Sequence, residues 1–116
     1  MSNSNNRFTR HYRLNDSALI RRVYTSGSKH RLGPFTLFVL ANNLDYPRIG
    51  LSIAKRYIAN ATMRNAIKRV LREGFRLAKL TMQHVDIVIT INCKIDKQQL
   101  QLLREQVNKI WARLHK

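Results

Sequence analysis

The sequence is poor in acidic residues and has no long apolar run. Only 6 of its 116 residues are Asp or Glu, against 22 Lys and Arg, which gives a net charge of +16. An excess this large indicates a polyanionic partner, either nucleic acid or an anionic membrane. Because no stretch approaches the ~20 apolar residues of a spanning helix and no lipidation motif is present, we expect no membrane partner.

The chain also lacks cysteine pairs and targeting segments. Its single cysteine, Cys93, excludes an internal disulfide and a cysteine-based zinc cluster. The start, M-S-N-S-N-N-R-F-T-R, has no apolar segment of the kind that a signal peptide needs. We therefore expect one cytoplasmic domain over residues 1–116, with 1–10 as a flexible arm. Phe8 in that arm either packs onto the domain or meets a base.

Patterns typical of an active site are missing as well. Four of the six acids fall at helix starts, in a turn and at a strand start, and no pair is obviously placed for acid–base work. The four histidines have no metal-ligand spacing, and there is no nucleophile elbow, phosphate loop or dinucleotide fingerprint. We predict a binding protein without catalytic residues of its own, and the sequence identifies no metal site.

A basic amphipathic segment covers residues 62–79, T-M-R-N-A-I-K-R-V-L-R-E-G-F-R-L-A-K. On a helical wheel its cations share an arc of roughly 140°. These cations are Arg64, Lys68, Arg69, Arg72, Arg76 and Lys79. The apolar residues, Ala66 and Leu77 among them, gather on the opposite arc, which predicts a helix with one buried face and one cationic face.

The cations of this segment repel one another. Arg64, Lys68, Arg72 and Arg76 follow at intervals of four, and like charges at that spacing destabilise a helix. A solvated surface helix normally mixes both signs, whereas a polyanion neutralises such a row. We therefore favour a nucleic-acid-binding face over a merely solvated one.

The rest of the chain predicts an α+β domain. Asp16-Ser17 is a helix-start signal and predicts a helix over 17–26, and Gly27 is the C′ residue just after its end. Residues 27–34 are expected to form a loop. Strands are expected at 35–40, 48–54 and 86–92. A capping box at Asp96 and Gln99 opens one long helix to about 114, with Leu100, Leu103, Val107, Ile110 and Leu114 at helical spacing. We predict the order α-β-β-β-α-β-α and a mixed sheet of about four strands packed with helices, which is one strand more than the three located here.

The strand at 48–54 has one apolar face and one nearly bare face. Ile49, Leu51 and Ile53 alternate with small side chains such as Gly50 and Ser52. The bare face suits either an open floor, which a sugar-phosphate backbone approaches closely, or the tight packing of a helix. Lys55 and Arg56 follow at once and add charge beside it.

The type of nucleic acid is less sharply marked. No helix-turn-helix or zipper accompanies the basic helix, which argues against DNA. The sheet lacks the aromatic pair of an RRM, and a KH-type G-x-x-G turn is absent. These patterns favour a polyanion binder that prefers RNA, and we expect no DNA partner.

Residues 48–76 resemble one known family. R-I-G-L-S-I-A-K-R, followed after about eight residues by R-N-A-I-K-R-V-L-R-E-G-F-R, is similar to the signature of the bacterial ribonuclease P protein subunit. The pattern R-N-R-x-K-R-x-x-R-x-x-F falls on Arg64, Asn65, Lys68, Arg69, Arg72 and Phe75. The likeness covers roughly residues 7–114. Ala66 replaces the second arginine of R-N-R; we expect a buried position and little cost, although one possible RNA contact is lost.

The resemblance implies a subunit of the endoribonuclease that removes the 5′ leader from precursor tRNA. In that family the RNA subunit is the catalyst and works with Mg²⁺, so no dedicated metal site on the protein is expected. The resemblance also implies a left-handed crossover between the strands at 48–54 and 86–92.

The same resemblance implies two sets of site residues. Facing the RNA subunit would be Arg64, Asn65, Lys68, Arg69, Arg72 and Arg76, with Lys55 and Arg56 beside them. Lining a central cleft for the single-stranded leader would be Arg13, Ile20, Tyr24, Phe38 and Ser52. Ile20 is a second departure, because an aromatic residue is common there. The alternative interpretation is a ribosomal protein that packs on ribosomal RNA.

Overall fold

A four-stranded mixed sheet in the order β1-β2-β4-β3 forms the centre of the computed structural model. The structure describes residues 12–115, apart from the side chains of Lys97 and Leu100, so the predicted arm and Phe8 lie outside the described part. The elements are α1 (Ser17–Ser26), β1 (Ser28–Leu32), β2 (Phe35–Ala41), β3 (Arg48–Ser52), α2 (Ala61–Ala78), the 3₁₀ turn η3 (Lys79–Thr81), β4 (Val85–Ile91), α3 (Lys97–Gln101) and α4 (Leu103–Leu114).

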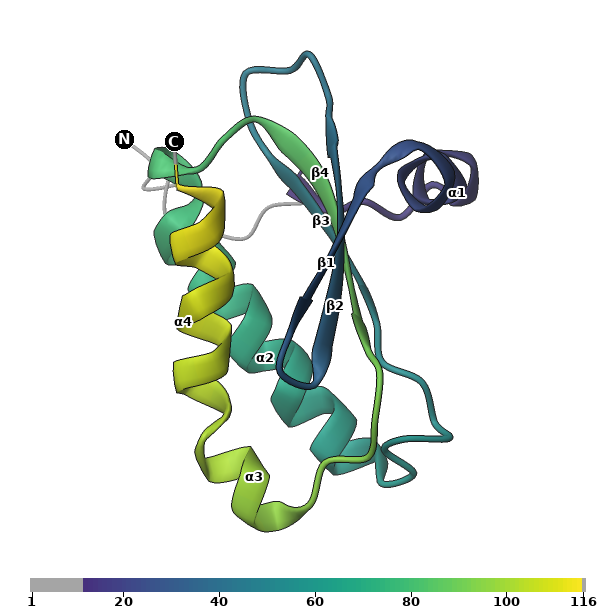
Figure 1. Cartoon of the computed structure of the whole chain (residues 1–116), viewed down its shortest axis with the longest axis vertical. Coiled ribbons are helices and arrows are strands. Elements are labelled where there is room, and N and C mark those ends of the chain that lie inside the picture. Colours follow the sequence, from purple (N-terminus) through teal and green to yellow (C-terminus); the bar gives the residue numbers. More distant parts are fainter. Residues whose placement is uncertain (1–11, 116) are drawn as a thin grey trace, which may run out of the picture.

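Helices cover the two faces of this sheet unequally. α2 and α4 pack side by side on one face, and α1 lies alone on the other (Figure 1). The larger core lies under α2 and α4, where alternate strand residues such as Leu37, Ile49 and Ile89 meet Ile67 and Leu71 of α2. The smaller core lies under α1. The predicted class and element order are confirmed. On the face that carries α1, this single helix leaves part of the sheet uncovered.

Strand β1 falls in the segment that the sequence predicted as a loop. It pairs antiparallel with β2 at the edge of the sheet, from Ser28 opposite Val39 to Leu32 opposite Phe35. Its sequence, S-K-H-R-L, has too few apolar residues to show the alternation of a half-buried strand. The ladder to β2 holds it in place instead, and its charged side chains suit an exposed edge.

The basic helix connects two neighbouring parallel strands. β3 and β4 are paired in parallel, with Ile49 opposite Ile87 and Leu51 opposite Ile89, and α2 lies between them in the chain. This is the predicted crossover; its left hand stays a prediction. Because α2 follows β3 in the chain and precedes β4, its N-terminal end is connected to the strand that carries the bare face.

The predicted start of the first helix at Asp16-Ser17 is confirmed, and the basic helix begins after Asn60. Asp16 accepts hydrogen bonds from the amides of Ala18 and Leu19, and Asn60 accepts one from Met63. Gly27 does follow α1, but its φ of −81° is extended rather than left-handed. It is needed for space, because a Cβ there would lie 2.6 Å from the Val23 carbonyl oxygen and 2.8 Å from that of Val39.

The predicted single C-terminal helix is divided in two. Asp96 and Gln99 form the expected capping box, with the Gln99 amide 2.8 Å from Asp96 Oδ1 and the Asp96 amide 3.0 Å from Gln99 Oε1. The chain then turns at Leu102, which is 59% exposed, and Leu103 enters the core as the first residue of α4. The short α3 makes the corner that carries the chain from β4 to the helical layer (Figure 1). Leu103, Val107, Ile110 and Leu114 are buried as predicted.

Gly74 sets the distance between α2 and α4. A Cβ at this position would lie 2.1 Å from Nε1 of Trp111, whose indole packs edge-on against Phe75 at 6.1 Å. We expect Gly74→Ala to lower the free energy of unfolding by about 1–3 kcal/mol, despite the better helix propensity of alanine, because the indole has no room to move. Urea unfolding measures the change. Trp111→Phe should reduce the penalty, and an equal penalty in both backgrounds would contradict this origin.

Candidate nucleic-acid interface

The cations of α2 lie beside its buried face rather than opposite it. Ile67, Leu71 and Phe75 are buried against the sheet, and Arg64, Lys68 and Arg72 are half-buried along the border of this stripe. Arg69 and Asn65 are more exposed, and Arg76 is half-buried. The row of cations thus runs where α2 meets the sheet, so its charge is directed along the groove between helix and sheet.

One predicted member of the row is internal. Lys79 is 3% exposed; its Nζ donates a hydrogen bond to the Arg76 carbonyl oxygen at 3.1 Å and lies 5.2 Å from the centre of the Tyr12 ring. Burial, and then the charge of Arg76, lower the pKa of Lys79. Lys79 closes the C-terminal end of α2 and is removed from the predicted cationic face.

Two apolar positions on the wheel also differ from the prediction. Leu77 is 66% exposed, because the buried stripe of α2 is narrower than the apolar arc. Ala66 is half-buried and borders a surface hollow of about 530 Å³ between α2 and α4. The small side chain at 66 therefore leaves open space, where we had expected a buried position.

Arg13 and Arg72 both line a second hollow, of about 360 Å³, along the edge strand β3. Arg13 belongs to the segment before α1, Arg72 reaches over from α2, and Gly50 and Leu51 of β3 lie between them. Burial, and then the charge of Arg13, lower the pKa of Arg72. Two like charges around one hollow indicate a site for an anion, since each would be stabilised by it.

Part of the predicted bare floor is covered. The Leu14 amide donates to the Ile49 carbonyl oxygen at 2.8 Å, and a Cβ on Gly50 would lie 2.9 Å from the Leu14 carbonyl oxygen. The backbone that approaches Gly50 is therefore the protein's own, and neither a helix nor an open floor lies there. Ser52, at the end of β3, is exposed and continues the same face beyond the covered part.

The predicted cleft residues gather on this face. Ile20 lines the Arg13–Arg72 hollow and packs with Phe38 in the smaller core. Tyr24, which is 38% exposed, meets Phe38 edge-on with ring centres 4.8 Å apart. Arg13, Ile20, Tyr24 and Phe38 thus form a continuous strip along α1, while Ser52 lies apart from the hollow on β3.

Two residues on this face escaped the sequence interpretation. Nζ of Lys29 lies 5.9 Å from the centre of the Phe38 ring, but Lys29 belongs to the strand that was read as a loop. Thr90 of β4 pairs with Ser52 and is half-buried. Its position between Ile89 and Ile91 could have placed it on this face by alternation alone.

Arg64 joins the basic helix to the loop that precedes it. Its Nη1 donates to the carbonyl oxygens of Ile58 and Ala59, both at 2.9 Å. Lys55 and Arg56 lie exposed in the same loop, and the Arg56 guanidinium lies 4.9 Å from the centre of the Tyr57 ring. Arg64 therefore holds the two loop cations beside the start of α2.

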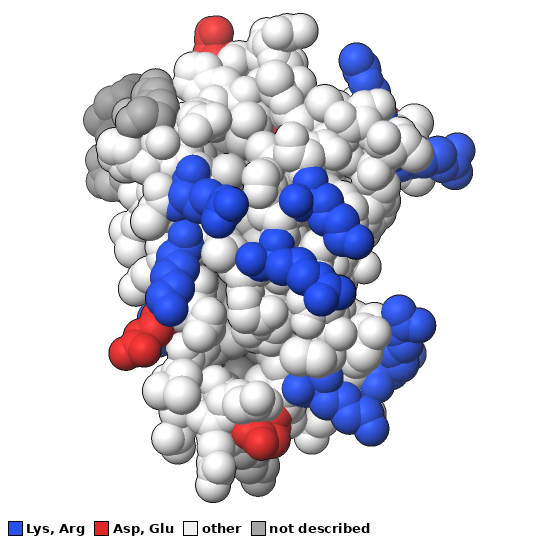
Figure 2. Space-filling view, in the orientation of Figure 1, with Lys and Arg blue, Asp and Glu red and all other residues white. Residues whose placement is uncertain are grey.

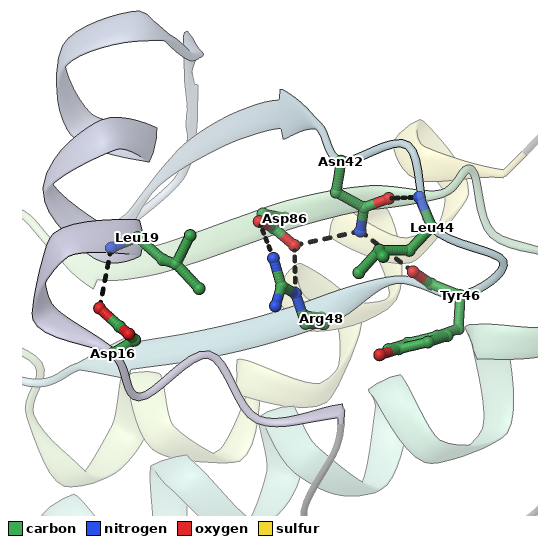
Figure 3. A network of polar contacts seen from close by, with 7 residues as sticks. All are labelled: Asp16, Leu19, Asn42, Leu44, Tyr46, Arg48 and Asp86. Carbon is green, nitrogen blue, oxygen red and sulfur yellow. Dashed lines mark hydrogen bonds and ion pairs between the residues drawn. The ribbon is translucent and has the colours of Figure 1, made fainter.

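Not every cation belongs to a surface. Arg48 forms an ion pair with Asp86, which is 4% exposed; Nε and Nη2 donate to the two carboxylate oxygens at 2.8 and 2.7 Å (Figure 3). Asn42 donates to the same carboxylate at 3.1 Å. The hydrogen bond to Asp86 raises the pKa of Arg48. This network joins β3, β4 and the loop after β2, and uses one charge inside the fold.

Positive charge extends beyond α2. Figure 2 shows separate basic side chains over the face with β1 and α4 toward the viewer, and few acidic ones. Among the side chains that the structure describes in residues 12–115, no group of three or more His, Cys, Asp or Glu is placed to hold a metal ion. Within the same range no helix is long and apolar enough to cross a membrane. The cytoplasmic location stays a prediction.

Fold and site together define a class: a small, very basic α+β protein with a cationic helix on one face of its sheet and a strip of aromatic and basic residues beside α1. The family model of ribonuclease P matches residues 8–115. The ribonuclease P protein component of Pseudoalteromonas translucida is 35% identical over 108 residues, which are 93% of this chain and 77% of that protein.

Solved structures agree with this match. The ribonuclease P protein of Staphylococcus aureus superposes with a TM-score of 0.74 at 30% identity, covering 90% of this chain and 98% of that one. The Thermotoga maritima protein shares the fold, with a TM-score of 0.72 at 24% identity over 90% and 98% of the two chains. The chain belongs to the ribonuclease P protein family, whose members serve in tRNA 5′ processing as the protein subunit of a ribonucleoprotein. This decides against the ribosomal alternative.

Proposed function

We propose that the protein holds the RNA subunit and the precursor-tRNA leader on two adjoining surfaces, while the chemistry occurs on the RNA. The observation that carries this proposal is the Arg13–Arg72 hollow. Arg72 belongs to the predicted RNA-subunit face and Arg13 to the predicted leader cleft, so the two surfaces meet at one anion site. A leader that emerges from the catalytic RNA would pass this point.

The first surface consists of α2 and the loop before it. Arg64, Lys68, Arg69 and Arg72 contact phosphates of the RNA subunit, Asn65 and Arg76 lie beside them, and Lys55 and Arg56 extend the row. Contacts of this kind fix position without reading sequence. Glu73 does not oppose binding, because both its carboxylate oxygens accept hydrogen bonds from Arg76, which lower the pKa of Glu73.

The second surface is the strip of Arg13, Ile20, Tyr24 and Phe38, with Ser52 apart from it on β3. Tyr24 is 38% exposed and offers a base a ring to stack on, and its T-shaped contact with Phe38 holds that ring in place. Stacking tolerates any base, which suits leaders of varied sequence. Ile20 supplies apolar contact only, so stacking falls to Tyr24.

Catalysis is assigned to the RNA subunit with Mg²⁺. Two of the six carboxylates are engaged inside the protein, Asp86 by Arg48 and Glu73 by Arg76. The contribution of this chain is therefore to bind and orient. By neutralising phosphates near the catalytic centre, it lowers the Mg²⁺ concentration that the RNA requires.

A reconstitution tests the proposal. We expect the protein to accelerate precursor-tRNA cleavage by its RNA subunit at low Mg²⁺. Tyr24→Ala should weaken binding of a precursor with a long single-stranded leader by about 5- to 100-fold, as the loss of one stacked base predicts. The control is the tRNA without its leader, which should bind equally with the unaltered protein and with the Tyr24→Ala variant. Absence of stimulation would contradict the function, and an equal loss on both substrates would contradict the leader strip.

A further inference from the structure

The hollow between α2 and α4 combines open space with unpaired positive charge. It has a volume of about 530 Å³ and is lined by Ala66, Arg69, Val70, Glu73 and Arg104. The first four form one stripe along α2, since they occupy positions i, i+3, i+4 and i+7 of the helix. Arg104 is the contribution of α4 and faces this stripe.

The packing of the two helices explains why Arg104 lies level with Ala66. α2 and α4 run in the same direction (Figure 1), and they are in close contact where Gly74 meets Trp111. Ala66 lies eight residues before Gly74, and Arg104 lies seven before Trp111. At 1.5 Å per residue these offsets are about 12 and 10 Å along each helix, so the two positions face each other.

The charges in the hollow favour an anion. Arg69 and Arg104 are both exposed, and in the described part of the chain neither forms an ion pair or a side-chain hydrogen bond. Glu73 also borders the hollow, but its carboxylate is hydrogen-bonded to Arg76. The hydrogen bond from Arg76, and then the charges of Arg76 and Arg104, lower the pKa of Glu73. Since neither Arg69 nor Arg104 is held in an ion pair, each guanidinium is able to bind a phosphate through two parallel hydrogen bonds.

We propose that Arg104 supplies from α4 the guanidinium that α2 lacks at position 66. Together with Arg69 it binds a phosphate of the RNA subunit over the open space at Ala66. The RNA-subunit face then extends across α2 onto α4 instead of ending at the helix. This inference rests on the proposed function, and it adds a binding residue that the resemblance does not assign.

Position 113 offers a matched control. Arg113 is also exposed on α4, but nine residues from Arg104, which places it on the opposite side of the helix. Arg113 does not line the hollow. Arg104→Ala and Arg113→Ala therefore each remove one positive charge from α4. They differ in the side of the helix from which the charge is removed.

The test measures affinity for the RNA subunit at several salt concentrations. Arg104→Ala should weaken binding about five- to tenfold and reduce the salt slope by about 1, as the loss of one phosphate contact predicts. Arg113→Ala should change affinity by less than about twofold. Adding Ala66→Arg to Arg104→Ala should restore binding, because the new guanidinium enters the same hollow.

The outcomes separate this inference from the function. Equal losses in Arg104→Ala and Arg113→Ala, or no restoration by Ala66→Arg, would overturn the assignment of Arg104. Thermal unfolding of each variant shows that the fold is unchanged. If instead the unaltered protein does not bind the RNA subunit, the proposed function itself fails.

Discussion

Raising salt from 50 to 200 mM is expected to weaken binding to the RNA subunit by about 10³-fold. About six cations of α2 and its loop would each displace counterions from a phosphate, and a slope of about −0.9 per contact gives roughly −5 in total. A fourfold rise in salt then costs three orders of magnitude. Filter binding or fluorescence anisotropy over this range measures the slope, and a flat dependence would contradict the interface.

Single variants separate charge from structure within this interface. Lys68→Ala should weaken binding and reduce the slope by about 1, because Lys68 acts by charge alone. Arg64→Ala should do both and also loosen the loop at 53–60, since Arg64 donates to the carbonyl oxygens of Ile58 and Ala59. We therefore expect the larger loss for Arg64→Ala.

A lysine outside the interface provides the control. Lys109 is exposed on α4, so Lys109→Ala changes the net charge by the same amount as Lys68→Ala. It should alter affinity by less than about twofold, since exposed charges beyond a Debye length are screened. Similar losses for the two lysine variants would indicate that net charge, not the row on α2, drives binding.

Local patterns predicted most of the fold. The amphipathic period of α2, the alternation of the strands and the capping box at Asp96 each depend on residues that are close in sequence. These features survived folding because they agree with the tertiary structure. β1 was missed for the opposite reason, since S-K-H-R-L becomes a strand only through its pairing with β2.

The site was predicted less completely, because a wheel records direction but not depth. It gave Lys79 a place among the surface cations, yet Tyr12 and the end of α2 enclose this side chain. It placed Ala66 with the buried residues, yet α4 diverges there and leaves a hollow. Both errors depend on what packs beside α2, and that information lies in distant parts of the chain.

The pair of Arg48 and Asp86 is the strongest case of such long-range dependence. The two residues are 38 positions apart, and the sequence interpretation treated Asp86 only as the start of a strand. In the structure the carboxylate is 4% exposed and accepts three hydrogen bonds, two from Arg48 and one from Asn42. Arg48 therefore stabilises the fold, and we expect its replacement to lower stability rather than RNA affinity.

We expect Arg48→Ala to lower the free energy of unfolding by about 3 kcal/mol, roughly a 100-fold change in the unfolding equilibrium. The variant leaves the Asp86 carboxylate buried with Asn42 as its remaining partner, and an uncompensated buried charge carries a penalty of this size. Asn42→Ala should cost less, about 1–2 kcal/mol, because the ion pair persists and only the hydrogen bonds of Asn42 with Asp86, Tyr46 and Leu44 are lost. Urea unfolding at neutral pH measures both.

A double variant shows whether the loss comes from the abandoned charge. Arg48→Met with Asp86→Leu removes both ions and fills the space with apolar groups, so it should be clearly more stable than Arg48→Ala. Equal stability would mean that Arg48 acts through packing of its aliphatic stem. RNA binding gives the second readout: where Arg48→Ala remains folded, its salt slope should match that of the unaltered protein, because the charge of Arg48 is already neutralised by Asp86.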